Sequence, residues 1–145
     1  RDRTYTTPMV TCNPMFAWDD LQEVLRDTLN RNVVVLDDDS GYDCEKCNTK
    51  TKAVKTVAIR GYPEVLVVAA QSRSHGMKAG NVTVDGNQYE TAAIVVHTGG
   101  DGSGHVVAYT CLAGNWYRCD DASVIPVTKR QVDGARPYMF FLKKV

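Results

Sequence analysis

The sequence lacks net charge, long apolar runs and internal repeats, and each absence excludes a class of protein. Its 145 residues include 17 Lys or Arg and 17 Asp or Glu, so the formal net charge is zero, and we expect no nucleic-acid or anionic membrane partner. Apolar runs such as residues 65–70 are far shorter than the roughly 20 residues that span a bilayer. We therefore expect one soluble folded unit that recognises its partner by shape and local contacts.

Signals for secretion are also missing. The N-terminus has no charged-then-apolar pattern of a signal peptide. The five cysteines are an odd number, which suits free thiols or a metal site better than a disulfide framework. We expect a cytoplasmic and/or nuclear protein. The chain begins at Arg1 rather than Met, and we also expect that an upstream segment has been removed.

Apolar periodicity predicts one main helix early in the chain. Within residues 16–31, apolar side chains recur at i, i+3, i+4 and i+8 and form one stripe. The stripe consists of Leu21, Val24, Leu25 and Leu29. Asp20 followed by Glu23 is a capping box for the helix start.

Strand-like segments follow from residue 53 onward. Residues 53–71 show β-branched alternation, then a turn, then an apolar run suited to a strand buried on both faces. We expect further strands within 89–100, 104–127 and 138–143, a hairpin turn at 113–115, and a short helix at 128–133 capped by Thr128. The predicted fold class is α+β, a mostly antiparallel sheet with one main helix.

Cys44 and Cys47 have the spacing of a metal-binding turn. Structural zinc takes four ligands, and the chain has no second Cys-x-x-Cys or His-x-His pair. Cys12 and His75 are the weaker candidates for the missing ligands. We expect no required cofactor, and structural zinc stays open at this point.

A glycine-rich segment lies between His97 and His105. Four of residues 99–104 are glycine, which lets the backbone bend or approach another group closely. A phosphate-binding loop needs a helix N-terminus after its glycines, whereas a strand is expected here, so nucleotide binding is disfavoured. A single histidine at a strand start is more often structural than catalytic, so His105 needs a partner before it indicates catalysis.

The adjacent acids Asp120 and Asp121 supply that partner. They follow on the return strand of the hairpin that His105 opens, and a carboxylate beside an imidazole is the orienting half of a Cys-His-Asp arrangement. Because strand side chains alternate faces, a two-residue turn puts Asp120 on the face of His105, and a three-residue turn puts Asp121 there. No Gly-x-Ser-x-Gly elbow supports a serine hydrolase.

Several spaced blocks together resemble the ubiquitin-specific proteases. They agree with that family in order and spacing over about residues 16–143, from its fingers to its histidine box and closing strand. The blocks are residues 42–47, Ala53 with Lys55, 63–67, 89–90, 94–97, 104–105, 108–109, Trp116, 120–121, Val124 and 135–142.

The resemblance implies hydrolysis of peptide or isopeptide bonds after the C-terminal glycine of ubiquitin or a ubiquitin-like protein. It gives His105 the role of general base, Asp120 that of the orienting acid and Asp121 a supporting role. Cys44 and Cys47 correspond to one of two cysteine pairs of a zinc knuckle in the fingers.

The resemblance also divides the single unit 1–145 into a fingers-like segment with the helix, about 1–60, and a palm, 61–145. Residues implied in holding the modifier's tail are His97, Gly104, Tyr109 and Trp116.

The sequence departs from the family at three places. Val106 replaces an aromatic residue after the histidine, and residues 71–73 replace an Arg-Phe at the end of the central strand. The cysteine box, Gly-Asn-x-Cys, is absent from this sequence. We therefore expect the nucleophile to come from a thumb segment or partner chain outside these 145 residues.

Two alternatives remain. In the first, the chain is a non-catalytic ubiquitin-binding relative. In the second, it is a compact viral-type papain-like protease with Cys12 as nucleophile. Pro14 separates Cys12 from the predicted helix, so the helix N-terminus would not lower the pKa of its thiol. Residues 6–12 are more simply a strand.

Overall fold

The computed structural model describes residues 8–12, 20–30, 34–36, 41–56, 58–72, 76–100 and 102–145. The predictions for Pro14 and His75, and the expectation about a segment upstream of Arg1, concern positions outside these residues. Within them, no helix is long and apolar enough to cross a membrane.

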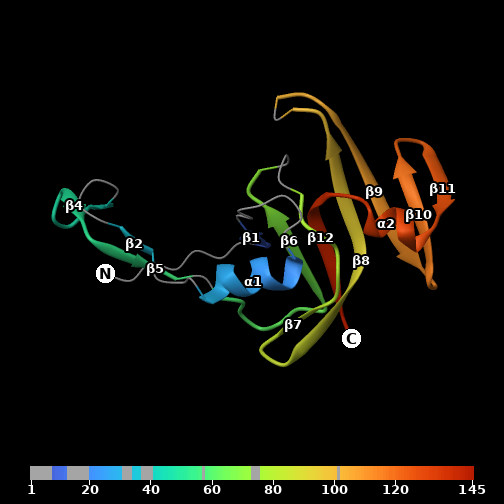
Figure 1. Ribbon diagram of the computed structural model, residues 1–145. Coiled ribbons are helices and arrows are strands. Elements are labelled where there is room, and N and C mark those ends of the chain that lie inside the picture. The colour runs from blue at the N-terminus through green and yellow to red at the C-terminus, as the bar shows by residue number, and fades with distance from the viewer. Residues whose placement is uncertain are drawn as a thin grey trace.

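An eight-stranded sheet dominates the described part of the chain (Figure 1). Its strands are β1 (Val10–Cys12), β6 (Val65–Ala70), β7 (Val82–Val84), β8 (Asn87–Thr98), β9 (His105–Leu112), β10 (Asn115–Asp120), β11 (Ser123–Val127) and β12 (Pro137–Lys144). The strand order is β1-β6-β12-β8-β9-β10-β11, with β7 paired to β8. All pairs are antiparallel except β1 with β6, so the predicted α+β, mostly antiparallel fold is confirmed.

Two small antiparallel hairpin-like pairs lie apart from this sheet (Figure 1). In one, β2 (Val34–Leu36) pairs with β5 (Ala53–Lys55), and in the other β3 (Tyr42–Cys44) pairs with β4 (Thr49–Thr51). Strand β1 belongs to the large sheet and not to these two pairs.

Helix α1 (Leu21–Asn30) forms where the apolar stripe predicts it. The backbone N–H of Gln22 donates to Asp20 Oδ1 at 2.8 Å, which caps the helix start. Leu21 and Leu25 are fully buried. The Gln22 side chain exchanges two hydrogen bonds with the backbone of Thr83, at 3.0 and 2.7 Å, and so ties α1 to β7.

The core is centred where β12 crosses the middle of the sheet. Phe140 is paired with Val68 of β6 and Ile94 of β8, and all three side chains are inaccessible to solvent. Each buried side chain of this size stabilises the fold by about 1.5–3 kcal/mol. The short helix α2 (Lys129–Asp133) adds Val132 to the core and has the predicted cap at Thr128.

Two strand predictions were wrong in detail. Strand β6 is not buried on both faces: Val65 is 51% exposed and Val67 is half-buried, because at the start of β6 only alternate side chains face the core. The strand expected to reach Ile59 ends at Lys55, and Ile59 packs against the core from an irregular segment.

Candidate active site

The hairpin of β9 and β10 has a two-residue turn. Leu112 pairs with Asn115, and the residues between them, Ala113 and Gly114, have φ values of 50° and 81°. Positive φ at both central positions is the type I′ geometry that matches strand twist. Of the two turns that the sequence left open, the structure has the shorter, and continuing its register brings Asp120 to the face of His105.

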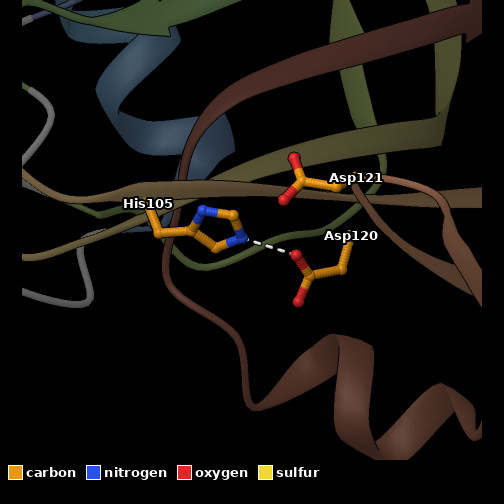
Figure 2. A group of neighbouring side chains, drawn as sticks. All are labelled: His105, Asp120 and Asp121. Carbon is orange, nitrogen blue, oxygen red and sulfur yellow. Dashed lines mark hydrogen bonds and ion pairs between the residues drawn. The ribbon is translucent and has the colours of Figure 1, made fainter.

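His105 and Asp120 form a hydrogen-bonded pair across the two strands (Figure 2). His105 Nε2 lies 2.5 Å from Asp120 Oδ1. A hydrogen bond from the imidazole, and then the carboxylate's charge, raise the pKa of His105. The same hydrogen bond lowers the pKa of Asp120. With Nε2 engaged, Nδ1 is the ring nitrogen left to accept a proton.

Arg118 is the second partner of Asp120. Its Nη1 lies 2.9 Å from Asp120 Oδ2, so the two carboxylate oxygens have different partners. Sequence analysis missed Arg118. The available signal was its position two residues before Asp120, which puts both side chains on one face of a strand.

Asp121 lies in the turn between β10 and β11, with φ of 49°. Figure 2 shows its carboxylate turned toward His105. One ligand atom each from His105, Asp120 and Asp121 lie within 4.8 Å of one another, and Asp121 contributes to raising the pKa of His105. Because His105 and Arg118 already occupy the Asp120 oxygens, the cluster is an ion-pair network rather than a preformed metal site.

The glycine-rich loop is anchored where Gly104 meets His97. Gly104 has φ of 147°, and a Cβ there would lie 2.1 Å from the Thr98 carbonyl oxygen and 2.7 Å from His97 Nε2. The His97 ring stands edge-on to Tyr138, with centroids 6.5 Å apart. Its Nδ1 is buried without a hydrogen-bond partner among the described residues. His97 therefore packs beneath the bend that leads into His105.

Tyr109 and Trp116 lie on the core side of the hairpin. Trp116 is 9% exposed and pairs with Cys111, and Tyr109 is partly buried against the same core. Contact of either residue with a modifier's tail stays a prediction, as it does for His97 and Gly104.

Comparison with known proteins shows the family of this chain. The family model described as ubiquitin carboxyl-terminal hydrolase matches residues 38–142. The chain belongs to the ubiquitin carboxyl-terminal hydrolase family. The predicted resemblance to its ubiquitin-specific proteases is confirmed.

Individual members of the ubiquitin carboxyl-terminal hydrolase family extend the match. Mouse ubiquitin carboxyl-terminal hydrolase 3 is 28% identical over 144 residues, covering 81% of this chain and 28% of that protein. Ubiquitin C-terminal hydrolase 22 of Arabidopsis thaliana is 46% identical over 54 residues, 37% of this chain and 10% of that protein. The chain thus spans under a third of the curated relatives that it matches.

Solved structures share the fold. A SAGA Ubp8/Sgf11/Sus1/Sgf73 DUB module bound to ubiquitin aldehyde superposes with a TM-score of 0.71 at 20% identity, covering 94% of this chain and 36% of that chain. A yeast SAGA DUB module with an Sgf73 mutant gives 0.73 at 23% identity, covering 94% and 35%.

Cys12, the alternative nucleophile, lies far from the histidine of this hydrolase-family site. It is on β1, four strands from β9 in the sheet order, a separation of about 19 Å at the usual strand spacing. Its side chain is 1% exposed, and burial raises the pKa of its thiol against a smaller opposing effect of a hydrogen bond with Thr28. A buried thiol with a raised pKa is a poor nucleophile.

Cys44 and Cys47 form the turn between β3 and β4. The backbone N–H of Cys47, then its side chain, then the backbone of Lys46 lower the pKa of the Cys44 thiol, while Cys44 raises the pKa of Cys47. Backbone donors to a thiolate suit a metal-binding knuckle. In the described ranges, no third Cys, His, Asp or Glu completes a cluster with them, so they fit half of a zinc site.

Proposed function

We propose that this chain carries the general base of a thiol-dependent deubiquitinase, with His105 as base, Asp120 as its orienting acid and Asp121 in support. The observation that carries the proposal is the Nε2 contact to Asp120 at 2.5 Å. This contact fixes the ring and leaves Nδ1 as the nitrogen that can take a proton from a thiol. The substrate is a bond after the C-terminal glycine of ubiquitin or a ubiquitin-like protein.

In this mechanism His105 Nδ1 takes the proton of the attacking thiol. The thiolate adds to the glycine carbonyl carbon, and the leaving amine receives that proton as the C–N bond breaks. Water, deprotonated by His105, then hydrolyses the thioester and restores the thiol. Asp120 stabilises the imidazolium and holds the ring throughout.

The nucleophile is supplied by a segment outside this sequence, in a thumb or on a partner chain. Besides buried Cys12, the thiols nearest in sequence are badly placed: Cys111 is six residues along β9 from His105, about 20 Å, and Cys119 lies on the opposite face of β10 from Asp120. Zinc would bind at Cys44 and Cys47 with two further ligands from outside this chain. All five cysteines are free thiols, in keeping with a cytoplasmic and/or nuclear location.

A second candidate is a non-catalytic ubiquitin-binding module, which the lack of a thiol within reach of His105 favours. An electrophilic ubiquitin probe separates the two. We expect no labelling of the isolated chain, and labelling of the thumb cysteine when a thumb segment is added. That labelling should be lost in His105→Ala. Retained ubiquitin binding without labelling or turnover in the assembled protein would favour the binding module, and labelling at Cys12 the compact protease.

A further inference from the structure

The carboxylate of Asp120 contacts two basic side chains, His105 and Arg118, on the same face of the hairpin. Oδ1 meets His105 at 2.5 Å and Oδ2 meets Arg118 at 2.9 Å. Arg118 precedes Asp120 by two residues on β10, and its cross-strand partners are Tyr109 on β9 and Ile125 on β11. The two carboxylate oxygens are therefore engaged by different side chains, one by the imidazole and one by the guanidinium.

Asp120 has few other restraints. It is the last residue of β10, its side chain is 25% exposed, and in the described residues its carboxylate has no hydrogen-bond partner besides His105 and Arg118. An aspartate at a strand end can turn toward solvent about two side-chain torsions. A guanidinium on the far oxygen opposes that rotation, since turning the carboxylate away would break its contact with Arg118 Nη1.

We propose that Arg118 is a positioning residue, whose guanidinium holds one oxygen of Asp120 so that the other stays directed at His105 Nε2. Arg118 acts through Asp120, and it fixes the ring that the proposed function uses as base. The inference rests on that function for its catalytic meaning. The contact geometry can nevertheless be tested on this chain alone, without a nucleophile or substrate.

The test depends on the sign of a change in the pKa of His105. The charged groups around that ring are Asp120, Asp121 and Arg118: the two carboxylates raise its pKa and the guanidinium lowers it. If Arg118 were only a nearby charge, Arg118→Met would remove a positive charge and the pKa would rise. If Arg118 positions Asp120, the same substitution loosens the carboxylate from the ring and the pKa falls.

The measurement is an NMR pH titration of the imidazole C–H signals, which the chain's three histidines make simple to assign. Asp120→Asn removes the carboxylate charge and so gives the direction and size of its full effect on the pKa of His105. We expect that pKa to fall. Arg118→Met should shift the pKa of His105 downward as well, and Arg118→Lys should restore part of that shift. In an Asp120→Asn background, Arg118→Met should no longer lower it.

The matched control is Arg26→Met, the same chemical change on an exposed position of α1, which packs against β1 and β7 at the far side of the sheet. It should leave the His105 titration unchanged. Circular dichroism establishes that each variant is folded, and Arg118→Gln replaces the methionine variant if that one is not. A rise or no change in folded Arg118→Met overturns the positioning role while the acid–base pair stands. No change in Asp120→Asn overturns both.

Discussion

The Thr98 carbonyl oxygen occupies the space in which a side chain on Gly104 would begin. A Cβ at residue 104 would lie 2.1 Å from that oxygen, far inside van der Waals contact. Because Gly104 directly precedes His105, the backbone that carries the base is held against β8 at a point where only glycine fits.

Replacing this glycine should therefore impair both the fold and the base. Gly104→Ala forces β8 and β9 apart at the start of β9 and imposes a positive φ on alanine, with a cost of about 1–3 kcal/mol in the free energy of unfolding. Denaturant unfolding measures the stability, and the His105 NMR signals report the site. Gly102→Ala is the control, since nothing lies within 4 Å of a Cβ there. Equal stability of the two variants would contradict the prediction.

The two acids should contribute unequally to catalysis. In the enzyme assembled with its nucleophile segment, we expect Asp120→Ala to lower kcat by on the order of 10²-fold or more, because the group that fixes the imidazole is lost. Asp121→Ala should cost much less, since Asp121 makes no hydrogen bond to His105 that fixes the ring. Asp133→Ala, on α2, controls for loss of an exposed carboxylate. A larger loss at Asp121 would reverse the assignment.

The His105–Asp120 pair should stabilise the fold over a limited pH window. A raised His105 pKa gives stability that is present below about 6.5 and lost as pH rises through the folded pKa; a lowered Asp120 pKa gives stability present above about 3.9 and lost as pH falls. The pair therefore contributes most between roughly pH 4 and 6.5. Asp120→Asn should lower Tm more at pH 5.5 than at pH 8.5.

Asp133→Asn is the matched control for this pH dependence. Asp133 pairs with a lysine, Lys129, rather than with a histidine, so its effect on Tm should be the same at the two pH values. An Asp120→Asn effect that is equally independent of pH would mean that the pair is absent in solution.

The cysteine pair should bind zinc weakly in this chain. Two thiolates are half of a structural zinc site, so the purified chain should hold well under one zinc per molecule by elemental analysis. Any zinc that it holds should be lost in Cys44→Ser and kept in Cys119→Ser, which alters a half-buried thiol on β10. One tightly held zinc per molecule would require further ligands from elsewhere in this chain.

Local signals in the sequence were sufficient for the helices and for the histidine with its acids. The stripe of α1 and the cap at Thr128 depend on residues within a few positions of one another, and such patterns are readable from sequence. Strand parity alone did not decide between Asp120 and Asp121, because turns of two and three residues both suited residues 113–115, and only the family resemblance favoured Asp120. That choice depends on cross-strand register.

Long-range pairing explains the other omissions. The parallel pairing of β1 with β6 joins residues far apart in sequence, and the exposure of Val65 depends on what covers each face of the sheet. Strand parity places Arg118 and Asp120 on one face of β10. It gives neither the side-chain torsions nor the carboxylate oxygen to which the guanidinium binds.

The burial of Trp116 has a consequence at the other end of its strand. If the hairpin slipped by one residue, every side chain of β10 would change faces: Trp116 would leave the core, and Asp121 rather than Asp120 would be brought round toward His105. Exposing the Trp116 indole would cost hydrophobic free energy, and this cost favours the register in which Asp120, rather than Asp121, reaches His105. A substitution that removes the buried indole of Trp116 would therefore weaken the fold and also the preference for Asp120, four residues away, as the acid beside His105.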